Sequence, residues 1–256
     1  MGQLYFSGTS GILLPYQNKS FYPEHLREKS RLAVYSLLFN SLEVNSSFYK
    51  IPQEKTVRRW AQETVDHFRF TFKIWQGITH QKGLDFVPDD VARFLCCVDA
   101  VGHKKGCLLL QLPPSTKFTA FINLTKLLTC IFQHKRSAGW HICVEFRHVS
   151  WYREEVFALL NAYGMAIVLH DKDGHGLINI QYDQANFIYL RFHGPKGDYG
   201  GSYDDVVLNE YSSYINKWLT EGKEVYAYFN NTMGAAIANL ETLAAATIGP
   251  KPNANQ

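Results

Sequence analysis

The chain has 256 residues, a formal net charge of +3, 46% hydrophobic and 14% aromatic residues. This length and apolar content predict one large folded domain or two small ones, and they exclude an intrinsically disordered chain. No Lys/Arg run exceeds two residues and no apolar run approaches the ~18 residues of a membrane span, so neither a nucleic-acid footprint nor a membrane segment is indicated.

The five cysteines are odd in number and form no CxxC pair, which favours free thiols in a reducing compartment over disulfides. No basic region followed by an apolar stretch opens the sequence, so a signal peptide is not predicted. We therefore expect a cytoplasmic protein.

Short β-rich runs alternate with helical patterns along the chain. Strands are predicted at residues 4–9, 42–46, 68–74, 107–112, 142–147, 165–171, 187–193 and 224–230. Helical spacing predicts helices over residues 27–39, 53–66, 89–101, 118–133, 153–163, 205–221 and 233–247. The sixth crossover, residues 172–185, is rich in Gly and Asp and is predicted to be an irregular loop.

Eight strands alternating with helices predict an α/β fold, a closed eight-stranded parallel (β/α)8 barrel of the TIM type. The rival is an open doubly wound sheet, but its first turn is normally GxGxxG, and Gly8-Thr9-Ser10-Gly11 does not match that motif. No linker interrupts the pattern. We expect a single domain over residues 1–248 and a flexible C-terminal tail over residues 249–256.

Four predicted strands carry polar residues two positions apart, with apolar residues between them. A period of two places such residues on one face of a strand, and buried charges are costly unless they are paired or used. Because active sites of this fold lie at the C-terminal ends of the strands, parity predicts an inward-facing polar set there: Ser7, Thr9, Glu43, Asn45, Lys73, Gln111, Glu145, Arg147, Asp171, Arg191, His193, Tyr228 and Asn230.

Individual members of this set also have a structural interpretation. Glu145 with Arg147, or Glu43 with Arg191, would serve equally well as ion pairs inside a barrel. His170 has the opposite parity to Asp171 and is expected to pack against a helix.

Two loops point towards an anionic ligand. Residues 194–201 are Gly-rich and long enough to form a flap. Asn231 opens a run of small residues before the last predicted helix, where backbone amides favour anions. Asn231 or Thr232 would otherwise only cap that helix. Together with Lys73, Arg147 and Arg191, the loops predict an anionic, possibly phosphorylated, substrate.

Several motifs resemble the YecE-like family, catalogued as domain of unknown function 72. They span residues 5 to 243 and include Glu43-Val44-Asn45-Ser46-Ser47-Phe48-Tyr49, Phe72-Lys73, Leu110-Gln111-Leu112-Pro113-Pro114, Val144-Glu145-Phe146-Arg147-His148, Arg191-Phe192-His193-Gly194 and Tyr228-Phe229-Asn230-Asn231. The resemblance implies a TIM-type barrel and no established activity. The chain departs from the family at Ile12, where Trp is usual.

The leading hypothesis is an enzyme of hydrolase or lyase type, without metal or cofactor, acting on a small polar anion. Its catalytic residues would be Glu145 as general acid or base, Lys73 as anion clamp or nucleophile, His193 as proton shuttle, and Asp171. The substrate would be bound by Glu43, Asn45, Gln111, Arg147, Arg191, Asn230 and Asn231.

Two alternatives stay open. The first is a metal-dependent hydrolase or isomerase that uses Glu43, Glu145, Asp171 and His193 as ligands, although three cations nearby oppose it. The second is a non-enzymatic module that binds a phosphorylated metabolite or nucleic acid.

Overall fold

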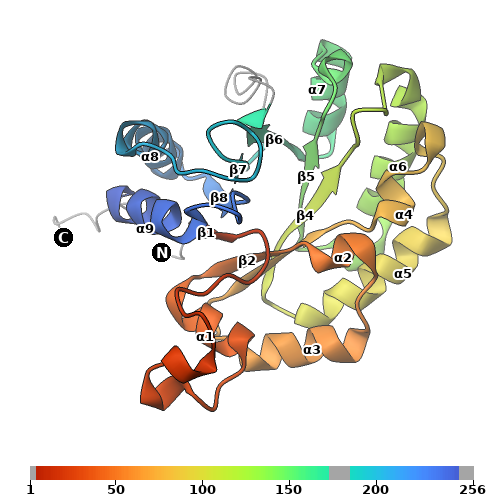
Figure 1. The fold of residues 1–256 in the computed structure, drawn as a ribbon. Coiled ribbons are helices and arrows are strands. Elements are labelled where there is room, and N and C mark those ends of the chain that lie inside the picture. The colour runs from red at the N-terminus through yellow and green to blue at the C-terminus, as the bar shows by residue number, and fades with distance from the viewer. Residues whose placement is uncertain (1–3, 173–184, 248–256) are drawn as a thin grey trace, which may run out of the picture.

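Eight parallel strands follow one another around a nearly closed barrel in the order β1-β8-β7-β6-β5-β4-β3-β2 (Figure 1). The structure is a computed structural model that describes residues 4–172 and 185–247. The strands are β1 (Tyr5–Thr9), β2 (Ser41–Val44), β3 (Arg69–Lys73), β4 (Lys105–Gln111), β5 (His141–Glu145), β6 (Ala166–His170), β7 (Phe187–Phe192) and β8 (Glu224–Phe229). The predicted TIM-type barrel is confirmed. The predicted irregular crossover (172–185), except for its two end residues, and the predicted C-terminal tail (249–256) lie outside the described residues.

Helices surround the strands (Figure 1). The seven predicted ones are present with shorter bounds: α1 (Arg31–Leu38), α3 (Glu54–Glu63), α5 (Pro88–Val98), α6 (Phe121–Gln133), α7 (Glu154–Ala162), α8 (Asp205–Thr220) and α9 (Ala236–Ala246). Two single-turn helices, α2 (Ser46–Tyr49) and α4 (Gln76–Thr79), follow β2 and β3 and were not predicted. Within the described ranges, no helix has the length and apolarity that crossing a bilayer requires.

The strands separate two apolar layers. Outward-facing side chains such as Phe72, Leu110 and Val144 pack with the helices in the main core. A second cluster fills the middle of the barrel; it contains Phe6, Cys107, Leu109, Cys143, Ala166, Val168, Phe187, Tyr189, Tyr226 and Tyr228. This division fixes which parity faces inward on each strand. All five cysteines are free, as expected.

Parity was assigned wrongly on two strands. On β1 the inward residue is Phe6, and Thr9 instead bonds Tyr35 of α1, so Ser7 and Thr9 do not belong to the interior set. On β6 the interior residues are Ala166 and Val168, which puts His170 on the inward parity. Asp171 follows the end of β6 instead of lying within it.

The seam between β1 and β2 is closed by side chains. The only strand-type bridge there joins Ser10 to Glu43 among the described residues. Asn40 replaces a neighbouring strand: its Oδ1 accepts from the Ser7 amide at 2.8 Å and its Nδ2 donates to the Tyr5 carbonyl at 2.9 Å. Tyr35 works likewise, because its hydroxyl accepts from the Thr9 amide at 2.7 Å and donates to the Ser41 carbonyl at 3.2 Å.

We expect Tyr35→Phe to lower the free energy of unfolding by about 1–3 kcal/mol, because a buried Thr9 amide would lose its acceptor. Urea unfolding followed by circular dichroism measures the loss. The matched control is Tyr214→Phe, whose hydroxyl bonds Glu210 on the exposed side of α8. Equal losses in the two variants would contradict the role of Tyr35 at the seam.

Candidate functional site

Arg191, at the C-terminal end of β7, lies between two buried glutamates from other strands. Its Nε and Nη2 donate to Oε2 and Oε1 of Glu43 at 2.9 and 2.7 Å. Its Nη1 donates to Oε2 of Glu145 at 2.6 Å. Arg191 is 2% exposed and both glutamates are 0% exposed. The guanidinium therefore ties β2, β5 and β7 together inside the barrel.

Each carboxylate oxygen of Glu43 accepts two hydrogen bonds from protein groups. Besides Arg191, Ser10 donates to Oε1 at 2.5 Å and Tyr189 donates to Oε2 at 2.6 Å. Burial by itself would raise the pKa of Glu43, but the charge of Arg191 and the hydrogen bonds from Arg191, Ser10 and Tyr189 together outweigh burial, and the pKa lies below its ordinary value. Glu43 is therefore an ionised structural anchor, and its predicted contact with substrate would require breaking this network.

Glu145 is held between two arginines. Arg191 contacts one carboxylate oxygen, and Nε of Arg147 forms an ion pair with the other. Burial opposes ionisation, yet the two guanidiniums hold the pKa of Glu145 well below its ordinary value. A carboxylate this acidic is a poor proton donor and a weak base near neutral pH. This geometry argues against Glu145 as the general acid.

His193 is fixed as a neutral ring. Arginine can only donate, so Nη2 of Arg147, 2.8 Å from Nε2 of His193, requires that nitrogen to carry a lone pair. The proton then sits on Nδ1, which faces Oδ1 of Asp171 at 3.3 Å. Burial lowers the pKa of His193 to about 4. The hydrogen bond to Asp171 raises this pKa in part, and the charge of Arg191 lowers it further. A proton shuttle through His193 would therefore require Arg147 to move away.

Asp171 organises the loop that follows β7. Its Oδ1 accepts the backbone amide of His193 at 2.9 Å, and its Oδ2 accepts the hydroxyl of Tyr203. Tyr203 in turn accepts the amide of Gly194 at 2.6 Å. These bonds orient His193 and the turn behind it. They give Asp171 a positioning role and do not support the catalytic role predicted for it.

Lys73 differs from the other cations of the site. It lies at the end of β3, half-buried, with Nζ 4.1 Å from the centroid of the Phe48 ring. Within residues 4–172 and 185–247 no carboxylate forms an ion pair with it, in contrast to Arg147 and Arg191. Burial, reinforced by the charge of Arg191, lowers the pKa of Lys73 to about 8.

His80 lies beside Lys73. Its ring is 4.8 Å from that of Phe48, and its Nδ1 is 2.9 Å from the Thr79 hydroxyl. Burial and the charge of Lys73 lower the pKa of His80 to about 4. Neutral His80 and Phe48 thus provide a weakly solvated surrounding for the Lys73 amine.

The predicted amide residues fall into two groups. Gln111 and Asn230 are half-buried and continue the inward parity of β4 and β8. Asn45 lies instead beside an apolar pocket of about 230 Å³ next to Trp60. Asn231 is fully buried and donates to Asn239 and to the Gly201 carbonyl. The structure therefore does not bring Asn45 or Asn231 to the charged residues.

The predicted anion site before the last helix is also not supported. The amides of Met233, Gly234 and Ala235 already donate to the carbonyls of Tyr199, Asn231 and Gly201. The bonds to Tyr199 and Gly201 fasten the loop after β7 to the loop after β8, whereas the sequence predicts a free flap. A Cβ on Gly234 would collide with the Gly201 carbonyl, so the close approach requires glycine.

Charges at this end of the barrel balance, contrary to the predicted cationic bias. Three cations (Lys73, Arg147 and Arg191) face three carboxylates (Glu43, Glu145 and Asp171). Within the part of the chain that the structure describes, no three His, Cys, Asp or Glu side chains converge as metal ligands. The carboxylate oxygens of Glu43 and Glu145 are already ion-paired with arginines, so these two residues of the alternative metal ligand set are not available to bind a metal.

Parity reasoning overlooked three residues of the site. His170 donates from Nε2 to the Phe146 carbonyl at 3.1 Å, and its ring is 5.7 Å from that of His193. Ser10 and Tyr189 complete the shell of Glu43. Ala166 and Val168, small and apolar, were the signal that could have located His170 on the interior face.

The sequence matches one family model and is similar to proteins that carry the same family name, UPF0759. The sequence model of a family described as "Protein of unknown function DUF72" matches residues 6–254. The UPF0759 protein YunF of Bacillus subtilis is 27% identical over 250 residues, which cover 86% of this chain and 87% of YunF. The UPF0759 protein YecE of Escherichia coli is 38% identical over 82 residues, 32% of this chain and 30% of YecE.

Solved structures resemble the whole fold. A DUF72 family protein from Enterococcus faecalis superposes with a TM-score of 0.76 at 19% identity, covering 97% of this chain and 99% of that one. A DUF72 family protein from Thermotoga maritima gives a TM-score of 0.68 at 25% identity, covering 95% and 98%.

Proposed function

The chain belongs to the DUF72 family, and we propose that it is an enzyme of lyase type in which the amine of Lys73 reacts with a small anionic carbonyl substrate. The observation that carries the proposal is the state of Lys73: half-buried, without a carboxylate partner in the described ranges, and with its pKa lowered to about 8. Desolvated lysines of this kind form Schiff bases with carbonyl compounds.

The other candidate groups favour a lyase over a hydrolase. A hydrolase would need a base to activate water, and Glu145 is ion-paired on both oxygens while neutral His193 already accepts from Arg147. An amine nucleophile needs no such base once it is neutral. We therefore place the chemistry on Lys73 and assign the arginine–glutamate network to holding the strand ends in register.

The reaction would run through an imine. Nζ of Lys73 attacks the carbonyl carbon and water leaves, which gives an iminium. The bond between the α carbon, which is next to the iminium carbon, and the β carbon then breaks: its electron pair passes into an enamine, and the fragment that departs becomes a carbonyl compound as its hydroxyl gives its proton to water. The enamine carbon takes a proton from water, which gives an iminium again. Water then hydrolyses the imine and restores the amine. Gln111 and Asn230, the half-buried amides at the ends of β4 and β8, would orient the substrate.

Reductive trapping tests the proposal. Purified protein is incubated with sodium cyanoborohydride and pyruvate, dihydroxyacetone phosphate or glyceraldehyde 3-phosphate, and the adduct is located by peptide mass spectrometry. We expect one adduct on Lys73, absent in Lys73→Arg, which keeps the charge and removes the primary amine. Adducts spread over surface lysines would contradict it, and thermal stabilisation without an adduct would indicate a binding module instead.

A further inference from the structure

A second ring of ionisable side chains occupies the opposite end of the barrel. Four strands begin with such a residue on the inward parity: Arg69 in β3, Lys105 in β4, His141 in β5 and Glu224 in β8. All four side chains are partly exposed: Lys105 to 17%, His141 to 32% and Glu224 to 36%, and Arg69 is half-buried. They therefore line an opening at this end of the barrel that solvent can reach.

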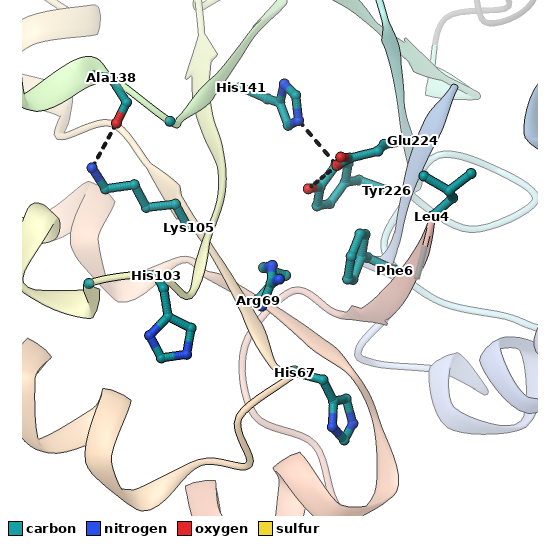
Figure 2. A pocket seen from close by; sticks show the side chains of 12 residues that line it. Leu4, Phe6, His67, Arg69, His103, Lys105, Ala138, His141, Glu224 and Tyr226 are labelled. Carbon is teal, nitrogen blue, oxygen red and sulfur yellow. Dashed lines mark hydrogen bonds and ion pairs between the residues drawn. The ribbon is translucent and has the colours of Figure 1, made fainter. Parts of the chain in front are cut away.

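These side chains surround one pocket of about 680 Å³ (Figure 2). Its apolar wall comes from Phe6 and Tyr226, whose rings stack at 5.0 Å. The volume is in the middle of the range of small-molecule sites, roughly 300–1,000 Å³, and far exceeds what one inorganic ion needs. The pocket has the size for an organic ligand.

One wall of the pocket offers cationic donors. Nη1 of Arg69 donates to the carbonyl oxygen of Phe68 at 3.2 Å. Arg69 has no ion-pair partner among the residues described. Lys105 shares its ammonium between Asp99 and the Ala138 carbonyl, both at 2.7 Å, which leaves one N–H. His67 and His103 lie on the same rim. The remaining N–H groups of the Arg69 guanidinium match the oxygens of a phosphate, and Lys105 lines the same pocket.

The facing wall offers acceptors. His141 and Tyr226 both bond Oε2 of Glu224, at 3.1 and 2.8 Å, and Oε1 has no hydrogen bond within the described ranges (Figure 2). The hydrogen bond from His141 lowers the pKa of Glu224 by more than burial raises it. The pKa therefore lies below its ordinary value, and the carboxylate is charged. A charged acceptor repels phosphate and accepts from hydroxyl groups.

We propose that this N-terminal pocket binds a sugar phosphate, with the phosphate on Arg69 and Lys105 and the sugar hydroxyls on Glu224. The two walls carry opposite chemistry across one space, as a ligand with an anionic end and a hydroxylated body requires. The site lies at the far end of the barrel from Lys73 and does not depend on the function proposed for that residue.

Isothermal titration calorimetry with glucose 6-phosphate, glucose and inorganic phosphate tests the site on the full chain. We expect glucose 6-phosphate to bind, and both fragments to bind at least about tenfold more weakly, because each engages only one wall. Arg69→Gln should weaken binding of glucose 6-phosphate by about tenfold or more, since a charge-assisted bidentate contact is lost. Arg69→Lys keeps the charge without the fork and should fall between.

The matched control is Arg58→Gln, which removes one positive charge from the exposed face of α3 and should leave binding unchanged. Glu224→Gln should weaken the binding of glucose 6-phosphate, because the sugar hydroxyls lose their charged acceptor, and should not weaken the binding of inorganic phosphate. Hydrogen exchange should show protection at the starts of β3, β4 and β8. Absence of binding at millimolar concentration, equal affinity in Arg69→Gln and Arg58→Gln, or protection confined to the strand ends around Lys73 would each overturn the proposal.

Discussion

Replacement of Arg191 by methionine should lower the free energy of unfolding by about 3–5 kcal/mol at pH 7, because it leaves two buried carboxylates without their shared cation. Glu43 loses two of its four hydrogen bonds and Glu145 loses one of its two arginines. Methionine fills a comparable volume, so the loss reports charge and not a cavity. Urea denaturation at fixed salt concentration measures it.

The pH dependence separates this explanation from general damage. In the native protein the pKa values of both glutamates are lowered, so their contribution to stability is complete above the ordinary value of 4.5 and is lost as pH falls below it. In Arg191→Met burial is opposed chiefly by Arg147 at Glu145 and by Ser10 and Tyr189 at Glu43, so the folded-state pKa values rise and protonation relieves part of the penalty. We expect the difference in stability between variant and native protein to shrink as pH falls from 7 to 5.

Two controls bound this result. Arg58→Met breaks an exposed ion pair on α3 and should cost no more than about 0.5 kcal/mol. The triple variant Glu43→Gln, Glu145→Gln, Arg191→Met removes all three charges together and should recover at least half of the loss. A deficit in Arg191→Met that is constant from pH 5 to 7, and that the triple variant does not recover, would contradict the account.

The fold was predictable because its signals are local. Apolar and polar positions alternate within each strand, and helical spacing separates the strands, so chain order alone indicates a parallel barrel. The closure of that barrel was not predictable. Asn40 and Tyr35 join β1 to β2 through side-chain hydrogen bonds, and nothing in their sequence neighbourhood distinguishes them from other loop and helix residues.

The site was predictable as a set of inward residues but not as a set of roles. Parity placed Glu43, Glu145 and Arg191 on the interior, and the structural interpretation of Glu43 with Arg191 as an ion pair agrees with their distances. Which cation would lack a partner depends on side-chain lengths across the barrel. Arg191 reaches both glutamates from β7, and Lys73 on β3 reaches neither.

Errors arose where strands end. Asp171 lies one residue beyond β6, so extending the strand through it reversed the parity of His170. Asn231 lies beyond β8 in a turn, where its amide bonds Asn239 of α9. Period-two reasoning holds only while the backbone is extended, and the C-terminal ends, where this fold places its chemistry, are where that condition stops.

The acylation of Lys73 should reach half its maximal rate near pH 8, because burial and Arg191 lower its pKa to about 8. A free lysine side chain, with a pKa of about 10.4, reaches that point more than two pH units higher. Competitive labelling with acetic anhydride and peptide mass spectrometry measures the midpoint. The midpoint, unlike the absolute rate, does not depend on how easily the reagent reaches the half-buried amine. A lysine peptide in the same tube is the internal standard.

Stability provides the second readout of the same group. A cation that is desolvated and lacks a carboxylate partner within the described ranges destabilises the folded state, so Lys73→Met should raise the free energy of unfolding by about 1–2 kcal/mol at pH 7. Between pH 8 and 10 the unfolded chain holds the proton that the folded chain has released, so the native protein becomes more stable as pH rises. The difference in free energy of unfolding between Lys73→Met and the native protein therefore narrows. Lys73→Arg, which stays charged, should show no gain. A labelling midpoint near pH 10, or a Lys73→Met variant less stable than the native protein, would show that Lys73 is an ordinary structural cation and would remove the basis for amine chemistry at this end of the barrel.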